Sequence, residues 1–296
     1  MVLIAGPWVS SAIGNQFNLV AGTLGNGISK GSWESGGTGG GNGSLTDADI
    51  VDPVNGTAFA VYSEDDHSLM FYKRKGLPKV GDMLNSRRVT AVYTGFETAR
   101  YERDSKPVTY GLDNVINTPW YSKKDEIETA SVVDSGIHPN CLSYWFANML
   151  NVKSVDIGKL EPAAPVECRW LFINCRKMKK VTLPAGLMPS TINDLFYFCS
   201  SLSGDGLNMP GFNMSKCVSA WSAFCHCTEL TGIPGIESWD TSKVTDFRDM
   251  FVDCNNLVAD LSPWDVSSSE SGGKIPHSFE DFNHNAPGVI LPKVWQ

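Results

Sequence analysis

The sequence has little charge, and positive charge is the scarcer sign. Only 19% of the 296 residues are charged, and 24 Lys and Arg against 32 Asp and Glu give a formal net charge of −8. Phosphate backbones and anionic lipids attract proteins with an excess of clustered cations. We therefore expect no nucleic-acid partner.

Long apolar runs are also lacking. No stretch approaches the roughly 20 apolar residues that a membrane-spanning helix needs, so we expect no membrane span. The opening segment Met1–Trp8 is apolar, but it lacks the Lys or Arg with which a signal peptide begins, and Gly6-Pro7 interrupts it. It does not predict a signal peptide, and export by the usual secretory route is not expected.

Apolar side chains and glycine are plentiful. The sequence is 42% hydrophobic and contains 28 Gly, 9 Trp and 14 Phe. A chain of this length can bury a core without disulfides or metals, and this composition indicates turn-rich structure with aromatic packing rather than a helical bundle. We expect no cofactor.

The first half of the chain divides into two zones. Residues 1–56 are rich in glycine, above all in the run Gly36–Gly43, and predict an anchoring segment that docks into a larger assembly. Residues 57–140 predict a small β-rich cap, because they hold β-branched and aromatic runs between turn residues. These runs are Thr57–Tyr62, Ser68–Tyr72, Val89–Tyr93 and Ile127–Val133.

A repeat dominates residues 141–296. Phe, two residues, Cys, two residues and then Leu or Met recur with Phe-to-Phe spacings of 24, 28 and 27. A weaker copy precedes them at Phe146, Met149 and Val152, and a decayed copy follows at Phe282, Asn285 and Gly288. The four clear copies are Phe172/Cys175/Met178, Phe196/Cys199/Leu202, Phe224/Cys227/Leu230 and Phe251/Cys254/Leu257.

A second series of residues has the same period. Phe212, Trp239 and Trp264 follow one another at spacings of 27 and 25 residues. Self-similarity of this period is typical of stacked repeat architectures. We interpret each unit as one short helical turn and one short strand, which predicts an α/β repeat solenoid.

The unit Ser238–Leu257 resembles the consensus repeat of the BspA-like leucine-rich-repeat family of bacterial surface proteins, whose units have about 26 residues. The resemblance covers roughly residues 57–289, because the β-rich runs are similar to the lead-in of many members, whereas residues 1–56 match nothing in the family. It implies a leucine-rich-repeat solenoid and a role in adhesion or recognition at a bacterial surface.

The repeated Phe and Cys residues are predicted to form a structural ladder in the core, since free Cys is among the most buried residue types. Disulfides between coils are the alternative, but the other four cysteines show no pairing framework, and we expect reduced thiols. Cys225-His226-Cys227 is spaced too tightly for a zinc site. The ladder residues are Phe172, Cys175, Phe196, Cys199, Phe224, Cys227, Phe251 and Cys254.

Two kinds of side chain are candidates for binding. Basic residues cluster at Lys73–Lys75 with Arg87 and Arg88, and again near residue 178; such clusters are usually solvated, but either could bind an acidic surface glycan. Aromatic side chains stack on sugars and anchor protein interfaces. The binding candidates are Trp120, Tyr121, Tyr144, Arg176, Lys177, Lys179 and Lys180.

Together these patterns favour a non-enzymatic recognition protein on an exterior surface. Without a leader, a phage virion component such as a fibre, decoration or receptor-binding protein, docked through residues 1–56, is slightly favoured over a bacterial cell-surface adhesin. Its partner would be a protein or glycan on a cell surface, and a homo-oligomer would suit such a protein. A different class is a glycan-processing enzyme with paired carboxylates in the cap, for which Asp65, Asp66 and Glu97 are candidates by type.

Overall fold

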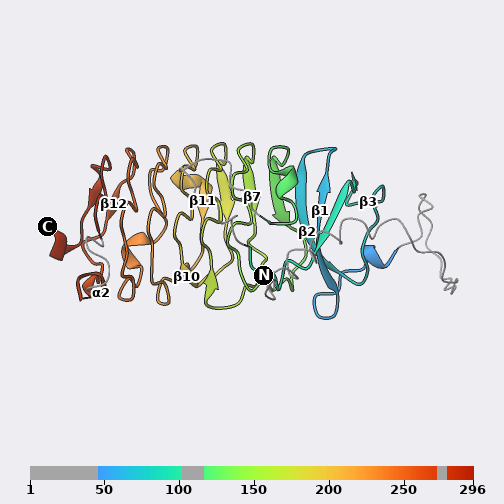
Figure 1. Ribbon diagram of the computed structural model, residues 1–296, viewed down its shortest axis with the longest axis horizontal. Coiled ribbons are helices and arrows are strands. Elements are labelled where there is room, and N and C mark those ends of the chain that lie inside the picture. The colour runs from blue at the N-terminus through green and yellow to red at the C-terminus, as the bar shows by residue number, and fades with distance from the viewer. Residues whose placement is uncertain (1–45, 102–116, 272–278) are drawn as a thin grey trace, which may run out of the picture.

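The computed structural model describes residues 46–101, 117–271 and 279–296. In these ranges the chain forms an elongated β-solenoid of about six coils, with an N-terminal hairpin at one end and the C-terminus at the other (Figure 1). Most of the predicted anchoring segment, residues 1–45, lies outside the described residues.

A β-hairpin begins the fold. Strand β1 (Thr57–Ser63) pairs with β2 (Ser68–Arg74), and β5 (Ala91–Thr94) pairs with the other edge of β1. Because side chains alternate across a strand, Ala60 faces the main core while Val61 faces a second, smaller core. The hairpin is therefore buried on both faces.

The hairpin and the first coils share one sheet of seven strands, in the order β11-β9-β7-β6-β2-β1-β5. The hairpin strands pair antiparallel, whereas β6 (Thr129–Val132) pairs parallel with β2 and the coil strands follow in parallel. The remaining coil strands of this sheet are β7 (Ser154–Asp156), β9 (Lys180–Thr182) and β11 (Leu207–Asn208).

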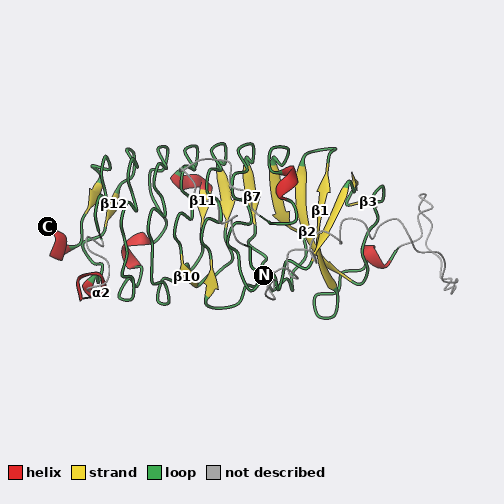
Figure 2. Ribbon diagram, in the orientation of Figure 1, coloured by secondary structure: helices red, strands yellow, loops and turns green. Residues whose placement is uncertain are grey.

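Other regular elements are short (Figure 2). The further strands are β3 (Met83–Leu84) with β4 (Arg87–Arg88), β8 (Val166–Glu167) with β10 (Pro189–Thr191), and β12 (Ala259–Asp260) with β13 (Val289–Ile290). The helices are α2 (Ser267–Ser271) and the 3-10 turns η3 (Asp47–Asp49), η4 (Tyr121–Lys123), η5 (Gly204–Gly206), η6 (Ile236–Ser238) and η7 (Lys293–Trp295).

Phenyl rings stack along the solenoid axis. Neighbouring ring centroids lie 5.2 to 5.8 Å apart, and every ring is fully buried. Coils that pair as strands lie about 4.8 Å apart, so equivalent residues of successive coils are brought into contact. The stack runs through Phe146, Phe172, Phe196, Phe224 and Phe251, and a second stack holds Phe212, Trp239 and Trp264.

Each ladder Phe lies between two residues with left-handed backbone. Around Phe172, for example, Trp170 and Asn174 both have φ of 59°. This pairing recurs two residues before and two residues after the ladder Phe in successive coils. The pairs are Tyr144/Asn148, Trp170/Asn174, Asp194/Phe198, Ser222/His226 and Asp249/Asp253, and the last coil has Asp281/Asn285.

The hydrogen bonds explain this backbone. The N–H of Cys175 donates to the carbonyl of Phe172 in its own coil (3.1 Å), while the N–H of Phe172 donates to the carbonyl of Leu195 in the next coil (2.9 Å). Bonds within a coil thus alternate with bonds between coils. The predicted helical turn in every coil is not confirmed. The sequence pattern favoured a helix because residues three apart face inward in this turn just as they do in a helix.

The cysteine thiols bridge the coils. The thiol of Cys199 lies 3.1 Å from the carbonyl oxygen of Phe172 in the preceding coil, and donates its weak S–H there. All eight cysteines are buried and free of disulfides. The same contact is made by Cys175, Cys227 and Cys254, at 3.0 to 3.2 Å.

The last coil has a different register from the predicted one. The N–H of Ala286 donates to Asn283 and that of Val289 to Ala286, which are the bonds made by Cys and Leu in other coils. Asn283 therefore takes the ladder position, and the predicted copy beginning at Phe282 is wrong by one residue. Phe282 is nonetheless buried, and its ring contacts that of Trp295, which covers this end of the solenoid.

Candidate binding surface

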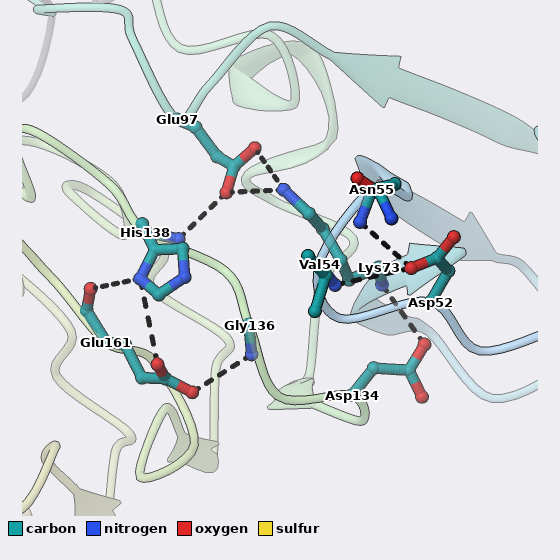
Figure 3. Close-up of polar contacts among 9 residues, drawn as sticks. All are labelled: Asp52, Val54, Asn55, Lys73, Glu97, Asp134, Gly136, His138 and Glu161. Carbon is teal, nitrogen blue, oxygen red and sulfur yellow. Dashed lines mark hydrogen bonds and ion pairs between the residues drawn. The ribbon is translucent and has the colours of Figure 1, made fainter. Parts of the chain in front are cut away.

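The polar cluster of the cap lies where β2 ends (Figure 3). The ammonium group of Lys73 donates to both carboxylate oxygens of Glu97, at 2.9 and 3.1 Å, and the backbone N–H of His138 donates to the same carboxylate at 2.8 Å. Lys73 is buried. Glu97 therefore joins β2 to the loop that leads into the first coil.

A second ion pair supports the same loop. The guanidinium of Arg74 donates to the carboxylate of Asp134 at 2.9 Å, and both side chains are buried. The backbone N–H of Gly136 donates to Glu161 at 3.0 Å, and Gly136 has φ of 80° with its Cα facing the carbonyl of Pro53. A Cβ there would lie 2.3 Å from that oxygen, so the close approach requires glycine.

The three cap carboxylates suggested for a glycan-processing enzyme have different basic partners. Asp66 forms an ion pair with Arg87, and Asp65 accepts the backbone N–H of Arg88 at 2.8 Å. Both lie in the turn between β1 and β2, whereas Glu97 is bound to Lys73. The contacts of these carboxylates hold turns and loops together.

The aromatic binding candidates pack against the first coil. Trp120 is fully buried, and its indole N–H donates to the carbonyl of Trp145 at 2.6 Å. In the next coil the equivalent carbonyl, that of Leu171, accepts the N–H of the ladder residue Phe146 of the preceding coil. Trp145 lies in the first coil, and the indole of Trp120 takes the place of such an N–H there. It offers no surface to a ligand. Tyr144 is also buried, beside the ring of Trp170.

Tyr121 leads instead to a column of side chains that runs from coil to coil, buried at Asn148 and Asn174 and partly exposed at Phe198, His226 and Asp253. Its hydroxyl accepts the side-chain amide of Asn148 at 3.3 Å, and the amide of Asn174 donates to Asn148 at 2.8 Å. We use the name outer column for the residues that lie two positions after each ladder Phe. The last coil contributes its equivalent left-handed residue. The residues of the outer column are Asn148, Asn174, Phe198, His226, Asp253 and Asn285.

Contacts continue along the outer column. The ring of Phe198 stacks on that of His226, with centroids 4.1 Å apart, and Nδ1 of His226 lies 2.9 Å from the carboxylate of Asp253. The amide of Asn285 donates to Asp253 at 2.6 Å. Phe198, His226 and Asp253 are each partly exposed. The column thus presents a ring, an imidazole and a carboxylate in three successive coils.

The predicted basic residues lie beside this column. Arg176, Lys177, Lys179 and Lys180 are all exposed, and the guanidinium of Arg176 lies 5.0 Å from the ring centroid of Phe198. The ammonium group of Lys177 donates to the side chain of Asn151 at 2.9 Å. Among the described residues, none of the four forms an ion pair within 4.0 Å.

Comparison with known families gives one match. Residues 190–293 match DUF285, described as a Mycoplasma protein of unknown function. The DUF285 match covers roughly a third of the chain, from the Phe196 coil to the last coil. Neither the curated proteins nor the solved structures gave a match to the chain. None of the helices in the described ranges has the length and apolar character that crossing a membrane requires.

Two residues of the DUF285-matching segment were missed as binding candidates. Phe198 and His226 both occupy left-handed positions, and Phe198 stands where other coils have Asn, Asp or His, which tolerate this backbone better. A bulky ring there carries a conformational cost, and such residues gather at functional sites. The signal available in the sequence was this departure from Asn or Asp two residues after the ladder Phe.

The metal-like motif has another explanation. The ring of His226 stacks on Phe198 and pairs with Asp253, while the thiol of Cys227 contacts the carbonyl of Phe196. Within the described ranges, no group of three His, Cys, Asp or Glu side chains is arranged to hold a metal ion. His226 and Cys227 thus contribute to ring stacking and to contacts between coils.

Proposed function

We propose that this chain is a non-enzymatic recognition protein that binds its partner through the outer column. The observation that carries the proposal is the contrast between two sets of positions in one solenoid. The ladder repeats Phe and Cys in coil after coil, whereas the outer column changes from Asn174 to Phe198, His226 and Asp253. Repeat proteins commonly bind through variable side chains carried on a constant core.

We further propose that the coils are leucine-rich repeats of the BspA-like type. The repeat length near 26 residues, the resemblance of Ser238–Leu257 to the family consensus and the DUF285 match all support this affiliation. The turns of this chain would then be a variant of that repeat, with left-handed residues in place of helix.

The protein is proposed to act on an exterior surface, as a phage virion component docked through residues 1–56, with a cell-surface adhesin as the alternative. Immunogold labelling of purified phage particles and of intact cells of the encoding organism separates the two. We expect gold on particles. Gold on the cell envelope of a strain cured of the phage would support the adhesin instead.

Recognition itself is tested by substituting the outer column. Phe198→Ala with His226→Ala removes two neighbouring side chains of the proposed binding surface and should weaken binding of the fluorescently labelled protein to intact target cells by about tenfold or more. Binding isotherms measured by flow cytometry give the apparent Kd.

The matched control replaces two exposed apolar side chains outside the column. Val218 and Val258 are 51% and 72% exposed, and Val218→Ala with Val258→Ala should leave cell binding within about twofold, since surface changes of this kind have small effects. Equal binding by the wild type and the column variant, both folded by circular dichroism, would show that the column is not the binding surface.

A further inference from the structure

We infer that the basic edge beside the outer column binds an anionic carbohydrate. This inference rests on the proposed function and names its ligand class. The basic edge comprises Lys153, Arg176, Lys177, Lys179 and Lys180, five cations within a stretch of 28 residues of a chain whose net charge is −8.

The backbone holds these cations together. The N–H groups of Lys179 and Lys180 both approach the carbonyl of Lys153, at 2.9 and 3.4 Å, so the three residues lie on adjacent coils. Lys153 is paired with Glu128, but the other four cations have no ion pair within the described ranges. Like charges held side by side repel, and a bound anion relieves that repulsion.

The acidic residues nearby do not neutralise the edge. Asp156 lies on β7, opposite Thr182 of β9, and Asp205 lies in η5 of the following coil. Both carboxylates are exposed, and neither forms an ion pair within 4.0 Å with a basic group of the described ranges. The edge therefore keeps an excess of positive charge at the surface.

The chemistry of this surface favours a hydrophilic anion over a protein. In the described part of the chain, no large apolar side chain between Met83 and Val218 is exposed. The edge itself has no such side chain. Protein interfaces depend on buried apolar and aromatic anchors, which this surface does not provide.

The ring beside the edge is already covered. Arg176 comes from the coil before Phe198 and His226 from the coil after it, at 5.0 and 4.1 Å from its centroid, so the ring lies between them. A nucleic-acid base stacks on a free aromatic face, and this ring has none. The ring instead orients the Arg176 guanidinium, whose fork of N–H donors suits a carboxylate or sulfate.

Binding of the full-length protein to immobilised polygalacturonate, a carboxylated polymer, and to heparin, a sulfated one, tests the inference by biolayer interferometry. Neutral dextran and a 20-nucleotide single-stranded DNA serve as comparison probes. We expect binding to at least one of the two anionic polymers that weakens with added salt, and none to dextran. The pair of polymers also distinguishes the two sources of negative charge.

Two variants with equal net charge make the test specific. Lys177→Gln, Lys179→Gln and Lys180→Gln together should weaken polymer binding by at least about tenfold, the change expected for losing several charge contacts. The same substitutions at the exposed residues Lys216, Lys243 and Lys293 should leave it within about twofold. Absence of binding to both polymers, equal loss in both variants, or equally tight binding of DNA would overturn the inference.

The cell-binding assay separates this inference from the proposed function. If the basic-edge variant binds cells like the wild type while the column variant does not, the anionic-carbohydrate inference fails and the proposed function stands. If neither variant changes cell binding, both the proposed function and the anionic-carbohydrate inference are wrong. Loss in both variants, with polymer binding lost only in the basic-edge variant, supports both.

Discussion

Replacing Phe196 by Ala is expected to lower the free energy of unfolding by about 3–5 kcal/mol. The ring is fully buried between those of Phe172 and Phe224, at centroid distances of 5.2 and 5.5 Å. Its removal leaves a cavity that two neighbouring coils border, because coils held by their own hydrogen bonds cannot collapse into it. Urea denaturation followed by circular dichroism measures the loss.

The control for this variant is Val258→Ala. Val258 is 72% exposed, so its truncation should change the free energy of unfolding by no more than about 0.5 kcal/mol. A loss below about 1 kcal/mol for Phe196→Ala would mean that the phenyl stack does not form the core.

Mild alkali is expected to unfold the protein. Burial raises the pKa of seven thiols above the usual value, to about 12 for Cys217 and Cys254. A raised pKa in the folded state gives stability that is complete below the unfolded-state pKa and is lost as the pH rises toward the folded-state pKa. The seven thiols are those of Cys168, Cys175, Cys199, Cys217, Cys225, Cys227 and Cys254.

The size of the alkaline effect follows from linkage. Above about pH 8.5, each such thiol lowers the free energy of unfolding by about 1.4 kcal/mol per pH unit, so seven together approach about 10 kcal/mol per unit. That is comparable with the whole stability of a typical domain. Urea midpoints measured at pH 7, 8, 9 and 9.5 with a reductant present should fall steeply above pH 8.5.

A single thiol deletion provides the control. Cys254→Ala should be less stable at pH 7, because the contact between the thiol and the Phe224 carbonyl is lost, but its stability should fall less steeply with pH by about one seventh. Equal urea midpoints at pH 7 and pH 9.5 in the wild type would show that the thiols are accessible to water.

The repeat was predictable from the sequence because stacking imposes one side-chain type on equivalent positions. Phe172, Phe196 and Phe224 share one environment, so selection for a buried ring leaves a visible period. The conformation between these positions was not predictable. Inward-facing residues three apart fit a helical turn as well as the observed pair of left-handed residues, and only the hydrogen bonds between coils distinguish the two.

Contacts between residues far apart in the sequence could not be predicted either. Arg74 and Asp134 are 60 residues apart, and nothing in their local pattern indicates a buried ion pair. Trp120 was predicted as an exposed anchor because aromatic residues outnumbered what a thin core needs. Its place is fixed by the unpaired carbonyl of Trp145 at the start of the solenoid, a requirement that arises only once the coils are stacked.

The left-handed turn carries the outer column, whose members Phe198, His226 and Asp253 are partly exposed. Ser222, with φ of 52°, tests it in the middle of the solenoid through two variants. Glycine tolerates left-handed backbone and alanine does not, so Ser222→Gly should be more stable than Ser222→Ala by about 1 kcal/mol in urea denaturation. In a helical turn the order reverses by a similar amount. An alanine variant more stable than the glycine variant would show that this turn is helical rather than left-handed.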